Sequence, residues 1–553
     1  MHGLKDGVKK AWRAGVATAA LILCWVILAL PNHLPALTER FWGFPPLELA
    51  PLIALLWLAP ARRSGGVAAW LTPALALTLS LLLLLKLADM MALQAYWRIF
   101  DPMDDRHLLG PGFNVLEGAL GPWRARLLGV GVLLGLALSF ALMWRGFRRL
   151  ARVARPTPAG RLLAGAGLVV LIGALSAGLW VERPPLAAST RLVIEHVSQS
   201  RQNLRDLAEL QKGARRDERR VVETDQLLNG LRDRDVLMVF VESYGRVLFS
   251  QARYSKALTP RLENIERSLE AGGFKARSAW LESPTVGGQS WLAHATLQSG
   301  LWINSQRRYN WLMGSERRSL SQLFERAGWR TLAVQPALTR DWSENAWYRF
   351  QKVYDARNLG YEGSPYNWVT MPDQYTLAAL QARELARPGR APVMAEVATI
   401  SSHAPWTPIP PLIDWEAVGD GRIFSQWADA GDPPDVVWQD SERVRRQYLL
   451  SIDYVLETLA AFVNRYGDDD LVMLVMGDHQ PATLITGEGA SRQVPVHVIT
   501  RDPGVLEAFR QWRWSAGMRP LSDAPEWGMD ELRPRLLERF SASAGRSGAT
   551  SVD

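Results

Sequence analysis

The sequence predicts an α-helical membrane domain followed by an α/β domain, whose central, mostly parallel sheet is covered by helices on both faces. Three observations support this class. Residues 1–181 consist mainly of Leu, Ala, Val and Gly, in apolar stretches near the length of about 20 residues that a membrane span needs. From about residue 235, short Val- and Leu-rich runs alternate with helical patterns, which is typical of a sheet covered on both faces. Several of these runs end in polar or charged residues, where open α/β sheets bind ligands.

Composition narrows the class of protein further. The 553 residues carry a formal charge of +8, and much of the basic excess lies in loops between apolar stretches. We therefore expect a membrane protein without a nucleic-acid partner. The single cysteine, Cys24, excludes an intrachain disulfide and a cysteine metal site. We expect a membrane domain at 1–181, a juxtamembrane helical connector at 182–232, a globular α/β domain at 233–540 and a disordered tail at 541–553.

Five stretches of the first domain are predicted to span the membrane: 14–31, 45–60, 67–88, 125–144 and 161–181. The second is short and contains Glu48 and Pro51. With five spans, the basic loops fall on one side, which the positive-inside rule assigns to the cytoplasm. These loops contain Lys5, Lys9, Lys10, Arg13, Arg62, Arg63, Arg145, Arg148, Arg149, Arg152, Arg155 and Arg161. The soluble half is then extracytoplasmic.

Two polar residues near the outer end of the third predicted span have two interpretations. Lys86 and Asp89 could line a site for a lipid headgroup, but snorkelling toward the membrane interface is the preferred explanation. His196, in the charged helical connector, is expected to be a solvated helix position.

The soluble half is predicted to alternate between strands and helices. The expected strands are Val236–Val241, Phe274–Trp280, Thr331–Gln335, Val393–Ile400, Leu471–Met476 and Val494–Thr500. The expected helices are 259–271, 290–300, 318–327, 372–387 and 441–465.

Two strand ends carry residue types that bind divalent metals. The apolar run 471–476 breaks at Gly477 and is followed directly by Asp478 and His479. A carboxylate oxygen beside a neutral imidazole suits a divalent cation, although Asp-His pairs also occur as turn caps. Glu242 follows the first strand, where it is either a metal ligand or a cap on the next turn.

The segment 283–300, SPTVGGQSWLAHATLQSG, contains the candidate nucleophile. Gly287 and Gly288 allow the backbone to approach a ligand closely. Ser290 is expected to begin a helix, either as a simple N-cap or as a hydroxyl at a phosphate- or sulfate-binding helix terminus. Metal coordination would make this hydroxyl a nucleophile near neutral pH. Thr285 is the competing candidate.

The remaining histidines of the soluble half are assigned from their local sequence. His403, in SSHAPW after a strand, is either a packed loop residue or a donor of a hydrogen bond or proton to a leaving group. His294 and His497 are assigned mainly to packing.

Glu242, the Gly-rich segment with its hydroxyl, SSHAPW and GDH occur in an order and spacing that resemble the alkaline phosphatase/sulfatase superfamily. Together with five N-terminal spans, they resemble the lipoteichoic acid synthase type of membrane phosphoglycerol transferase. The resemblance covers the architecture of nearly the whole chain, and its specific motifs lie within 235–500.

The resemblance implies roles for individual residues. The metal ligands would be Glu242, Ser290, Asp478 and His479, and Ser290 would be the catalytic nucleophile, where the family usually has threonine. His403 would contact substrate, as would Trp347 and Arg349 in ENAWYRF, which resembles a Trp-Asn-Arg segment with Tyr348 in place of asparagine. A guanidinium such as that of Arg349 can also bind a phosphate with two parallel hydrogen bonds.

These ligands make one four-ligand site, and the soluble half has few spare histidines for a second. We therefore expect one divalent ion, with Mn²⁺ favoured over Mg²⁺ or Zn²⁺. The leading hypothesis is a phosphotransferase of a bacterial inner membrane. It would move phosphoglycerol from a phospholipid donor, phosphatidylglycerol, to a glycan or glycolipid acceptor through a phospho-serine intermediate.

Three alternatives remain open at this point. A phosphoethanolamine transferase is disfavoured because lipid A enzymes of that type commonly carry disulfides, which this chain cannot form. A sulfatase or phosphodiesterase is the second, although SWLAH lacks the Cys/Ser-x-Pro-x-Arg pattern of formylglycine sulfatases. The third is a non-catalytic membrane scaffold with a degenerate domain.

Overall fold

The computed structural model describes residues 2–33, 48–58, 67–108, 121–153, 188–222, 226–367 and 369–541, with isolated positions between these ranges. The chain forms two compact units, which are described separately. One comprises Met1–Asp105 and Pro122–Arg205, and the other comprises Arg106–Gly121 and Asp206–Asp553. The domain limits drawn from the sequence at 181 and 232 stay predictions, and residues 542–553 of the predicted tail lie outside the described residues.

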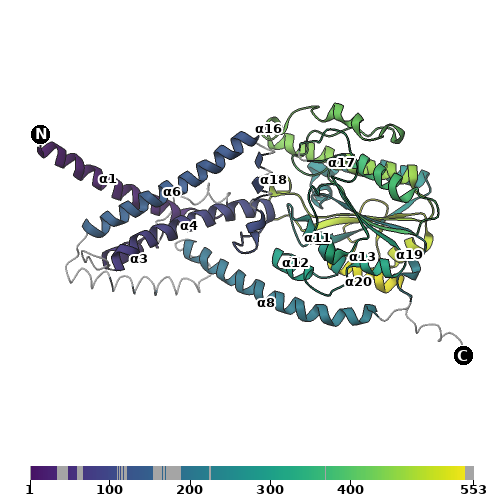
Figure 1. Ribbon diagram of the computed structural model, residues 1–553, viewed down its shortest axis with the longest axis horizontal. Coiled ribbons are helices and arrows are strands. Elements are labelled where there is room, and N and C mark those ends of the chain that lie inside the picture. Colours follow the sequence, from purple (N-terminus) through teal and green to yellow (C-terminus); the bar gives the residue numbers. More distant parts are fainter. Residues whose placement is uncertain are drawn as a thin grey trace. The chain divides into compact units, whose positions relative to one another are not determined.

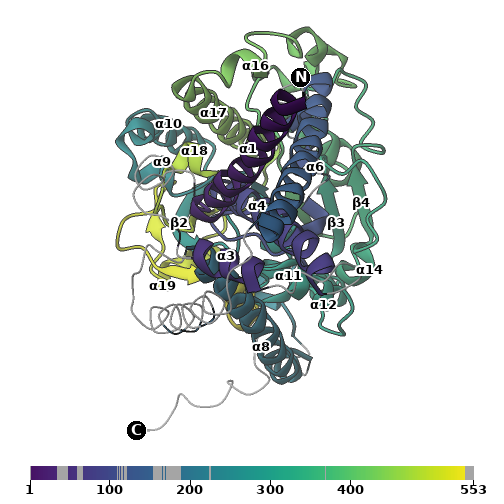
Figure 2. The same cartoon turned by 90° about the vertical axis from the view of Figure 1, so that its left-hand side faces the viewer.

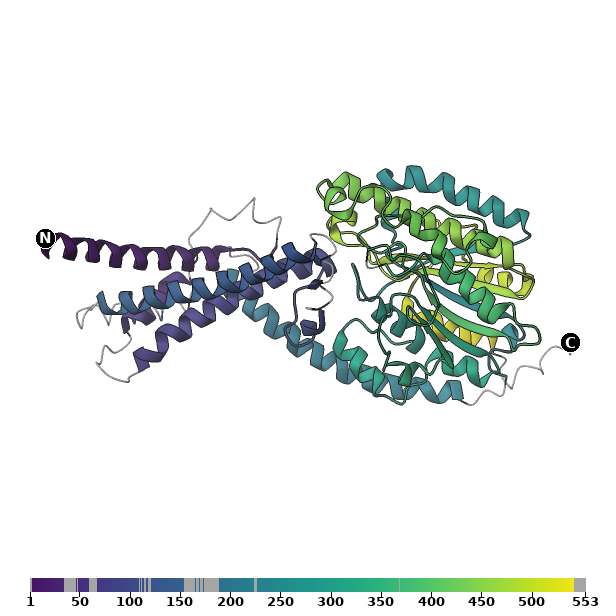
Figure 3. The same ribbon diagram turned by 45° about the horizontal axis from the view of Figure 1, so that its top comes forward.

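The N-terminal unit is helical. Its helices are α1 (His2–Ala29), α3 (Leu49–Leu58), α4 (Val67–Tyr96), α6 (Pro122–Val153) and the first half of α8 (Ala188–Val222). Figure 3 shows α1, α4 and α6 running alongside one another. At Gly146 of α6 a Cβ atom would overlap the side chain of Ala20 on α1, so glycine is what permits this close approach.

The prediction of five membrane spans is corrected by this unit. Within the described residues, only two helices are long and apolar enough to cross a membrane, at Trp70–Tyr96 and Pro122–Ala151. The apolar part of α1, Ala14–Ala29, would extend only about 24 Å and α3 about 15 Å, against a hydrocarbon core of about 30 Å. The fifth predicted span, 161–181, falls outside the continuous described ranges. The two apolar helices suggest membrane anchoring.

Lys86 and Asp89 are buried inside this unit and do not snorkel. The Lys86 ammonium donates to the carbonyl oxygens of Ile27, Leu28 and Leu30 at 2.9, 3.0 and 2.6 Å, so it caps the C-terminal end of α1. The Asp89 carboxylate accepts from the Phe100 amide at 2.9 Å and lies 3.0 Å from His196 Nε2. His196 is therefore a partner of Asp89 and not a purely solvated position.

The second unit is built on one sheet, which Figure 1 shows with helices on both sides. The sheet is nine-stranded and mostly parallel, in the order β4-β3-β5-β1-β6-β7-β2-β8, with β9 beside β2. The strands are β1 (Asp235–Val241), β2 (Lys275–Glu282), β3 (Arg330–Gln335), β4 (Lys352–Asp355), β5 (Val393–Ala398), β6 (Leu471–Gly477), β7 (Gln493–Thr500), β8 (Ser515–Ala516) and β9 (Glu526–Gly528). The five strands β4, β3, β5, β1 and β6 are mutually parallel, so their carboxyl ends meet at one edge.

Helices cover both faces of this sheet, as predicted. On one face lie α10 (Ala252–Ala271), α15 (Asp373–Leu380) and α17 (Ser441–Tyr466), with α10 packed beside α17 (Figure 2). On the other lie α11 (Ser290–Ser299), α12 (Gln306–Met313), α13 (Leu320–Arg326), α14 (Asn345–Tyr348), α19 (Pro503–Gln511) and α20 (Met529–Phe540). Short helices α9 (Val247–Ser250), α16 (Pro434–Val437) and α18 (Thr483–Thr486) lie in the loops.

Every residue of β1 is buried, and alternate residues enter different cores: Leu237, Val239 and Val241 pack under α10 and α17, and Val236, Met238 and Phe240 under α11 and α13. A strand buried on both faces has no polar alternation, which is why the unbroken apolar runs were correct indicators of strands. The sequence did not indicate β4, β8 and β9, which are two to four residues long and lie toward the sheet edges.

Candidate active site

Strand β1 delivers Glu242 to the carboxyl edge of the sheet, where the residue is 8 % exposed. Its Oε1 accepts a hydrogen bond from Ser243 Oγ at 2.9 Å and its Oε2 accepts one from Ser290 Oγ at 3.1 Å. Ser243 has φ 58°, a left-handed conformation that costs about 1–2 kcal/mol for a residue other than glycine. This conformation lets the Ser243 amide donate to Asp478 Oδ1 at 2.8 Å while its hydroxyl contacts Glu242.

Strand β6 is the direct neighbour of β1 and brings Asp478 and His479 to the same edge, with Val241 paired to Gly477. A Cβ atom at Gly477 would overlap the carbonyl oxygen of Tyr244, so the strand end requires glycine. His479 Nδ1 lies 2.9 Å from the Gln480 carbonyl oxygen, which can only accept. Nδ1 therefore carries the proton, and the lone pair is on Nε2.

That Nε2 atom faces the carboxylates, at 3.4 Å from Glu242 Oε1 and 3.5 Å from Asp478 Oδ2. The ligand atoms of Glu242, Asp478 and His479 all lie within 4.8 Å of one another, and all three residues are buried. Burial and the neighbouring Glu242 charge raise the pKa of Asp478 to about 7. Although burial disfavours the imidazolium form of His479, the Asp478 and Glu242 carboxylates raise its pKa above the ordinary value.

These residues fit a divalent metal ion. Burial and the mutual repulsion of the two carboxylates both raise the pKa of Asp478, and a cation between the carboxylates would offset both effects. The His479 tautomer, with Nδ1–H given to a backbone carbonyl and Nε2 pointing at the carboxylates, is the arrangement that metal-binding histidines adopt.

Ser290 begins α11 and is partly exposed, whereas Glu242, Asp478 and His479 are buried. Its Oγ lies 3.1 Å from Glu242 Oε2 and 3.3 Å from His479 Nε2. Gln289, at the N-cap, has φ 64° and directs the chain into the helix. Thr285, the competing candidate, instead donates its hydroxyl to the Gly288 carbonyl oxygen at 2.7 Å and is 5 % exposed. The geometry places Ser290, and not Thr285, against the carboxylates.

His403 lies in the loop that follows β5, and the charges of His479 and Asp478 act on its ring. Burial lowers its pKa to about 4, so the ring is neutral at pH 7. Its Nδ1 lies 2.9 Å from the Ala404 carbonyl oxygen and therefore holds the proton. The start of this loop is fixed by Asp373, whose carboxylate accepts from the amides of Ile400 and Ser401 at 2.8 and 3.1 Å.

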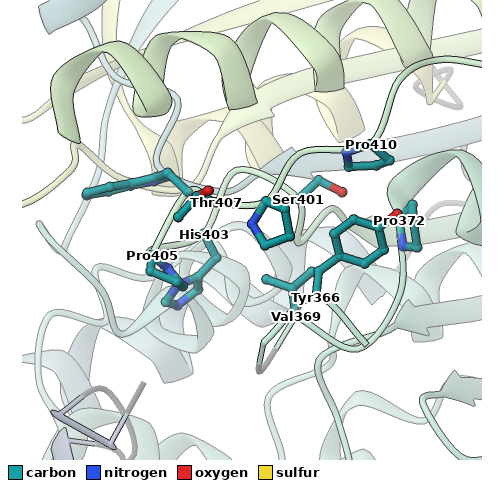
Figure 4. A pocket seen from close by; sticks show the side chains of 10 residues that line it. Tyr366, Val369, Pro372, Ser401, His403, Pro405, Thr407 and Pro410 are labelled. Carbon is teal, nitrogen blue, oxygen red and sulfur yellow. The ribbon is translucent and has the colours of Figure 1, made fainter. Parts of the chain in front are cut away.

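A small recess of about 10 Å³ adjoins His403, room for about one water molecule (Figure 4). Its walls combine polar and apolar surface in similar amounts and consist of Tyr366, Val369, Pro372, Ser401, His403, Pro405, Trp406, Thr407, Pro408 and Pro410.

The structure does not bring Trp347 and Arg349 to this group. Two residues after Arg349, the Gln351 amide donates to the Thr331 carbonyl oxygen near the start of β3. Thr331 on β3 and Val236 on β1 both pair with Met394 on β5, so they lie at the same level of the sheet. Glu242 follows Val236 by six residues, which places it about 20 Å from this level along the strand direction. Trp347 is buried, and Arg349 is exposed in a left-handed conformation that ends α14.

The arginine that β3 does place at the carboxyl edge is Arg340. It is exposed and follows the end of β3 by five residues. The adjacent Asp341 pairs at 2.7 Å with Arg357, which follows the end of the parallel strand β4, so this loop lies at the same edge as Glu242. The sequence offered a signal for Arg340, because it is a cationic residue shortly after a predicted strand. Glu242 and Asp478 were identified in the same way, as charged residues that follow predicted strands.

Ser243 and Asp373 were also missed. Serine after Glu242 had no signal of its own, because its role depends on a left-handed backbone that only the structure shows. Asp373, at a predicted helix start, resembled an ordinary acidic first turn.

Comparisons with known proteins place this domain in a family. Residues 234–495 match the family model described as Sulfatase. No curated protein matches the chain in sequence.

Solved structures that resemble the chain include the lipoteichoic acid synthase LtaP from Listeria monocytogenes, at 14 % identity and TM-score 0.37 over 58 % of this chain and 75 % of that one. The phosphoglycerol transferase GacH of Streptococcus pyogenes, in complex with sn-glycerol-1-phosphate, has 13 % identity and TM-score 0.38 over 61 % and 81 %. The C-terminal periplasmic domain of EcEptC from Escherichia coli, in complex with Zn, has 13 % identity and TM-score 0.34 over 49 % and 73 %.

The family match covers the segment that contains Glu242, Ser290, His403, Asp478 and His479. Residues 234–495 therefore form an enzyme domain of the sulfatase/alkaline phosphatase superfamily.

Proposed function

We propose that the protein is a membrane-anchored, metal-dependent phosphotransferase that moves a phospholipid headgroup to a glycan or glycolipid. The donor we propose is phosphatidylglycerol, and phosphoglycerol is the group transferred. The observation that carries the proposal is the partly exposed Ser290 hydroxyl at the start of α11, in contact with Glu242 and His479 of the buried acidic group.

Glu242, Asp478 and His479 would hold the metal, with Ser290 as a fourth ligand. A divalent cation there supplies positive charge that lowers the pKa of a hydroxyl and stabilises a phosphoryl group. The oxygen-rich set with one imidazole favours Mn²⁺, with Mg²⁺ and Zn²⁺ as alternatives.

The reaction would proceed in two displacements at phosphorus. In the first, the Ser290 Oγ–P bond forms, the bond from phosphorus to the diacylglycerol oxygen breaks, and diacylglycerol leaves with the proton that Ser290 gives up. In the second, an acceptor hydroxyl attacks phosphorus, the Ser290 Oγ–P bond breaks, and the proton of the acceptor hydroxyl ends on Ser290 Oγ. An exposed guanidinium at the same edge, that of Arg340, would bind the phosphodiester.

His403 would act as a proton acceptor and not as the donor considered from the sequence. Because the ring is neutral and its Nδ1 proton is given to Ala404, Nε2 has a lone pair. Nε2 can take the proton of the acceptor hydroxyl in the second displacement.

We also propose that this domain faces away from the cytoplasm. Arg145, Arg148 and Arg149 lie at the C-terminal end of α6, which the positive-inside rule assigns to the cytoplasmic side. The span expected from the sequence at 161–181 would return the chain to the outer side before the domain begins. Protease added to spheroplasts should digest the domain, and its full protection would contradict this orientation.

The test uses full-length protein in detergent with Mn²⁺ and headgroup-labelled phosphatidylglycerol. Mass spectrometry should find a phosphoglycerol adduct on Ser290 that is absent from Ser290→Ala and from protein treated with chelator. A phosphoethanolamine adduct from mixed lipids would instead identify a phosphoethanolamine transferase. Rapid release of free glycerol phosphate without acceptor would identify a hydrolase. A metal-loaded protein that forms no adduct and turns over no phosphodiester would refute the proposal.

A further inference from the structure

Glu396 is a carboxylate in the middle of the core and is not one of the three residues, Glu242, Asp478 and His479, that would hold the metal. It lies on β5 opposite Met238 and Ala333 and is fully buried. A buried carboxylate costs several kcal/mol unless hydrogen bonds satisfy it. Glu396 receives such bonds from His294 Nδ1 to Oε1 at 2.8 Å and from Gln298 Nε2 to Oε2 at 2.8 Å.

Both of these donors belong to α11, the helix that begins with Ser290. His294 and Gln298 follow Ser290 at spacings of four and eight, so the three lie along one stripe of the helix. The His294 ring also stacks on Phe240 of β1, with centroids 3.9 Å apart. Phe240 precedes Glu242 by two residues, so His294 connects the nucleophile's helix to the two strands that end in Glu242 and in the His403 loop.

Gln298 extends the connection to a second helix. Its Nε2 donates to Glu396, and its Oε1 accepts from the Ser321 amide of α13 at 3.0 Å. The two ends of the Gln298 amide are therefore not interchangeable. A donor must face Glu396 and an acceptor must face Ser321.

We infer that Glu396, His294 and Gln298 are positioning residues for the nucleophile, which fix the rotation of α11 so that Ser290 Oγ points at Glu242 and His479. Apolar packing is non-directional and would leave this rotation weakly specified, whereas two hydrogen bonds from one stripe of the helix to one strand specify it. The inference rests on the proposed function in taking Ser290 as the reacting group. A displacement of about 1 Å at a reacting atom can cost about 100-fold in rate.

The decisive experiment exchanges the carboxylate and the amide. In Glu396→Gln, an amide NH₂ at position 396 faces either the NH₂ of Gln298 or, if the new amide turns over, the Gln335 Nε2 donor that lies 3.4 Å from Glu396 Oε1. At least one hydrogen bond is lost in each orientation. In Gln298→Glu, two carboxylates face each other. In the double variant Glu396→Gln/Gln298→Glu, the amide of position 396 donates to the carboxylate of position 298, which still accepts from Ser321, and His294 still donates to position 396. Every hydrogen bond is then restored, and the negative charge lies at position 298 instead of position 396.

Two readouts are measured on full-length protein: Mn²⁺ affinity, and turnover of bis(p-nitrophenyl) phosphate, a model phosphodiester. We expect each single variant to lose about 10- to 100-fold in kcat with KM changed less than about threefold, and about 10-fold in Mn²⁺ affinity. The double variant should recover to within about threefold of wild type. Singles that behave as wild type, or a double no better than the singles, would overturn the inference.

A second pair of variants applies if the charge exchange prevents folding. In His294→Asn the amide nitrogen takes the place of Nδ1 and can still donate to Glu396, whereas in His294→Gln it takes the place of Nε2 and cannot. Both lose the stacking on Phe240, so thermal unfolding should be affected similarly. Only His294→Gln should show the loss of kcat and Mn²⁺ affinity, and equal losses in the two would overturn the inference.

The Mn²⁺ affinities distinguish a failure of this inference from a failure of the proposed function. If wild type binds Mn²⁺ but acts on no phosphodiester, the proposed function fails. The order of Mn²⁺ affinities across the variants still decides whether the network positions Ser290.

Discussion

Replacing Asp478 with Asn should stabilise the metal-free protein and abolish its stabilisation by metal. The Asp478 pKa of about 7 is raised from 3.8 by burial and by repulsion from Glu242. A carboxyl whose pKa is higher in the folded state favours folding at low pH, and that contribution is lost as pH rises through the folded value. Folding around this carboxyl without metal therefore costs about 4 kcal/mol at pH 8 and about 2 kcal/mol at pH 5. Asparagine removes this cost and keeps Oδ1, which accepts from the amides of Ser243 and His479.

The assay is thermal unfolding of full-length protein in detergent, followed by tryptophan fluorescence at pH 5 and pH 8, with chelator or with Mn²⁺. With chelator, Asp478→Asn should unfold at a higher temperature than wild type at pH 8, and the difference should shrink at pH 5. With Mn²⁺ the order should reverse, because only wild type retains all the ligands. Asp373→Asn, at a buried aspartate outside the metal-binding group, is the matched control and should retain the Mn²⁺ shift. A chelated wild type at least as stable as Asp478→Asn at pH 8, or equal Mn²⁺ shifts in both, would refute the reasoning.

Two further predictions concern the approach to the site. Gly477→Ala should lower the unfolding temperature and weaken Mn²⁺ binding, because its Cβ would overlap the Tyr244 carbonyl oxygen at a cost of about 1–3 kcal/mol. Gly314→Ala, where the nearest atom would be 3.8 Å away, is the control, and an equal effect in both would contradict the steric argument. Arg340→Ala should raise KM for a phosphodiester about 10-fold or more, since it removes a charged hydrogen-bond donor at the edge that carries Ser290. Arg349→Ala should leave KM near wild type, and the opposite order would show that the substrate reaches the other end of the sheet.

Sequence patterns were sufficient to predict the class of the second unit and the meeting of Glu242, Asp478 and His479 in one buried group. Strands buried on both faces appear as continuous apolar runs, and parallel strands bring their carboxyl ends to one edge. The side chains directly after β1 and β6 could therefore be expected to lie close together from the order of the apolar runs alone. Ser290 was identifiable because a helix start within a Gly-rich loop has a local signature. Each of these features depends on a few residues that are neighbours in the sequence, so local sequence patterns can predict it.

Other features depend on distance along an element or on contacts between segments far apart in sequence, and these required the folded chain. Apolar composition identified five stretches, and among the four that fall largely within the described residues, helix length leaves two as candidates for crossing a membrane. The motif ENAWYRF placed Arg349 in the substrate site, but the register of β3 with β4 places it near the opposite edge and leaves Arg340 at the carboxyl edge. His294 was assigned to packing because nothing near it in sequence reveals Glu396, its partner 102 residues away. Hydrogen bonds between residues so far apart in the sequence form only after the chain has folded. Composition and the spacing of residue types therefore do not predict them.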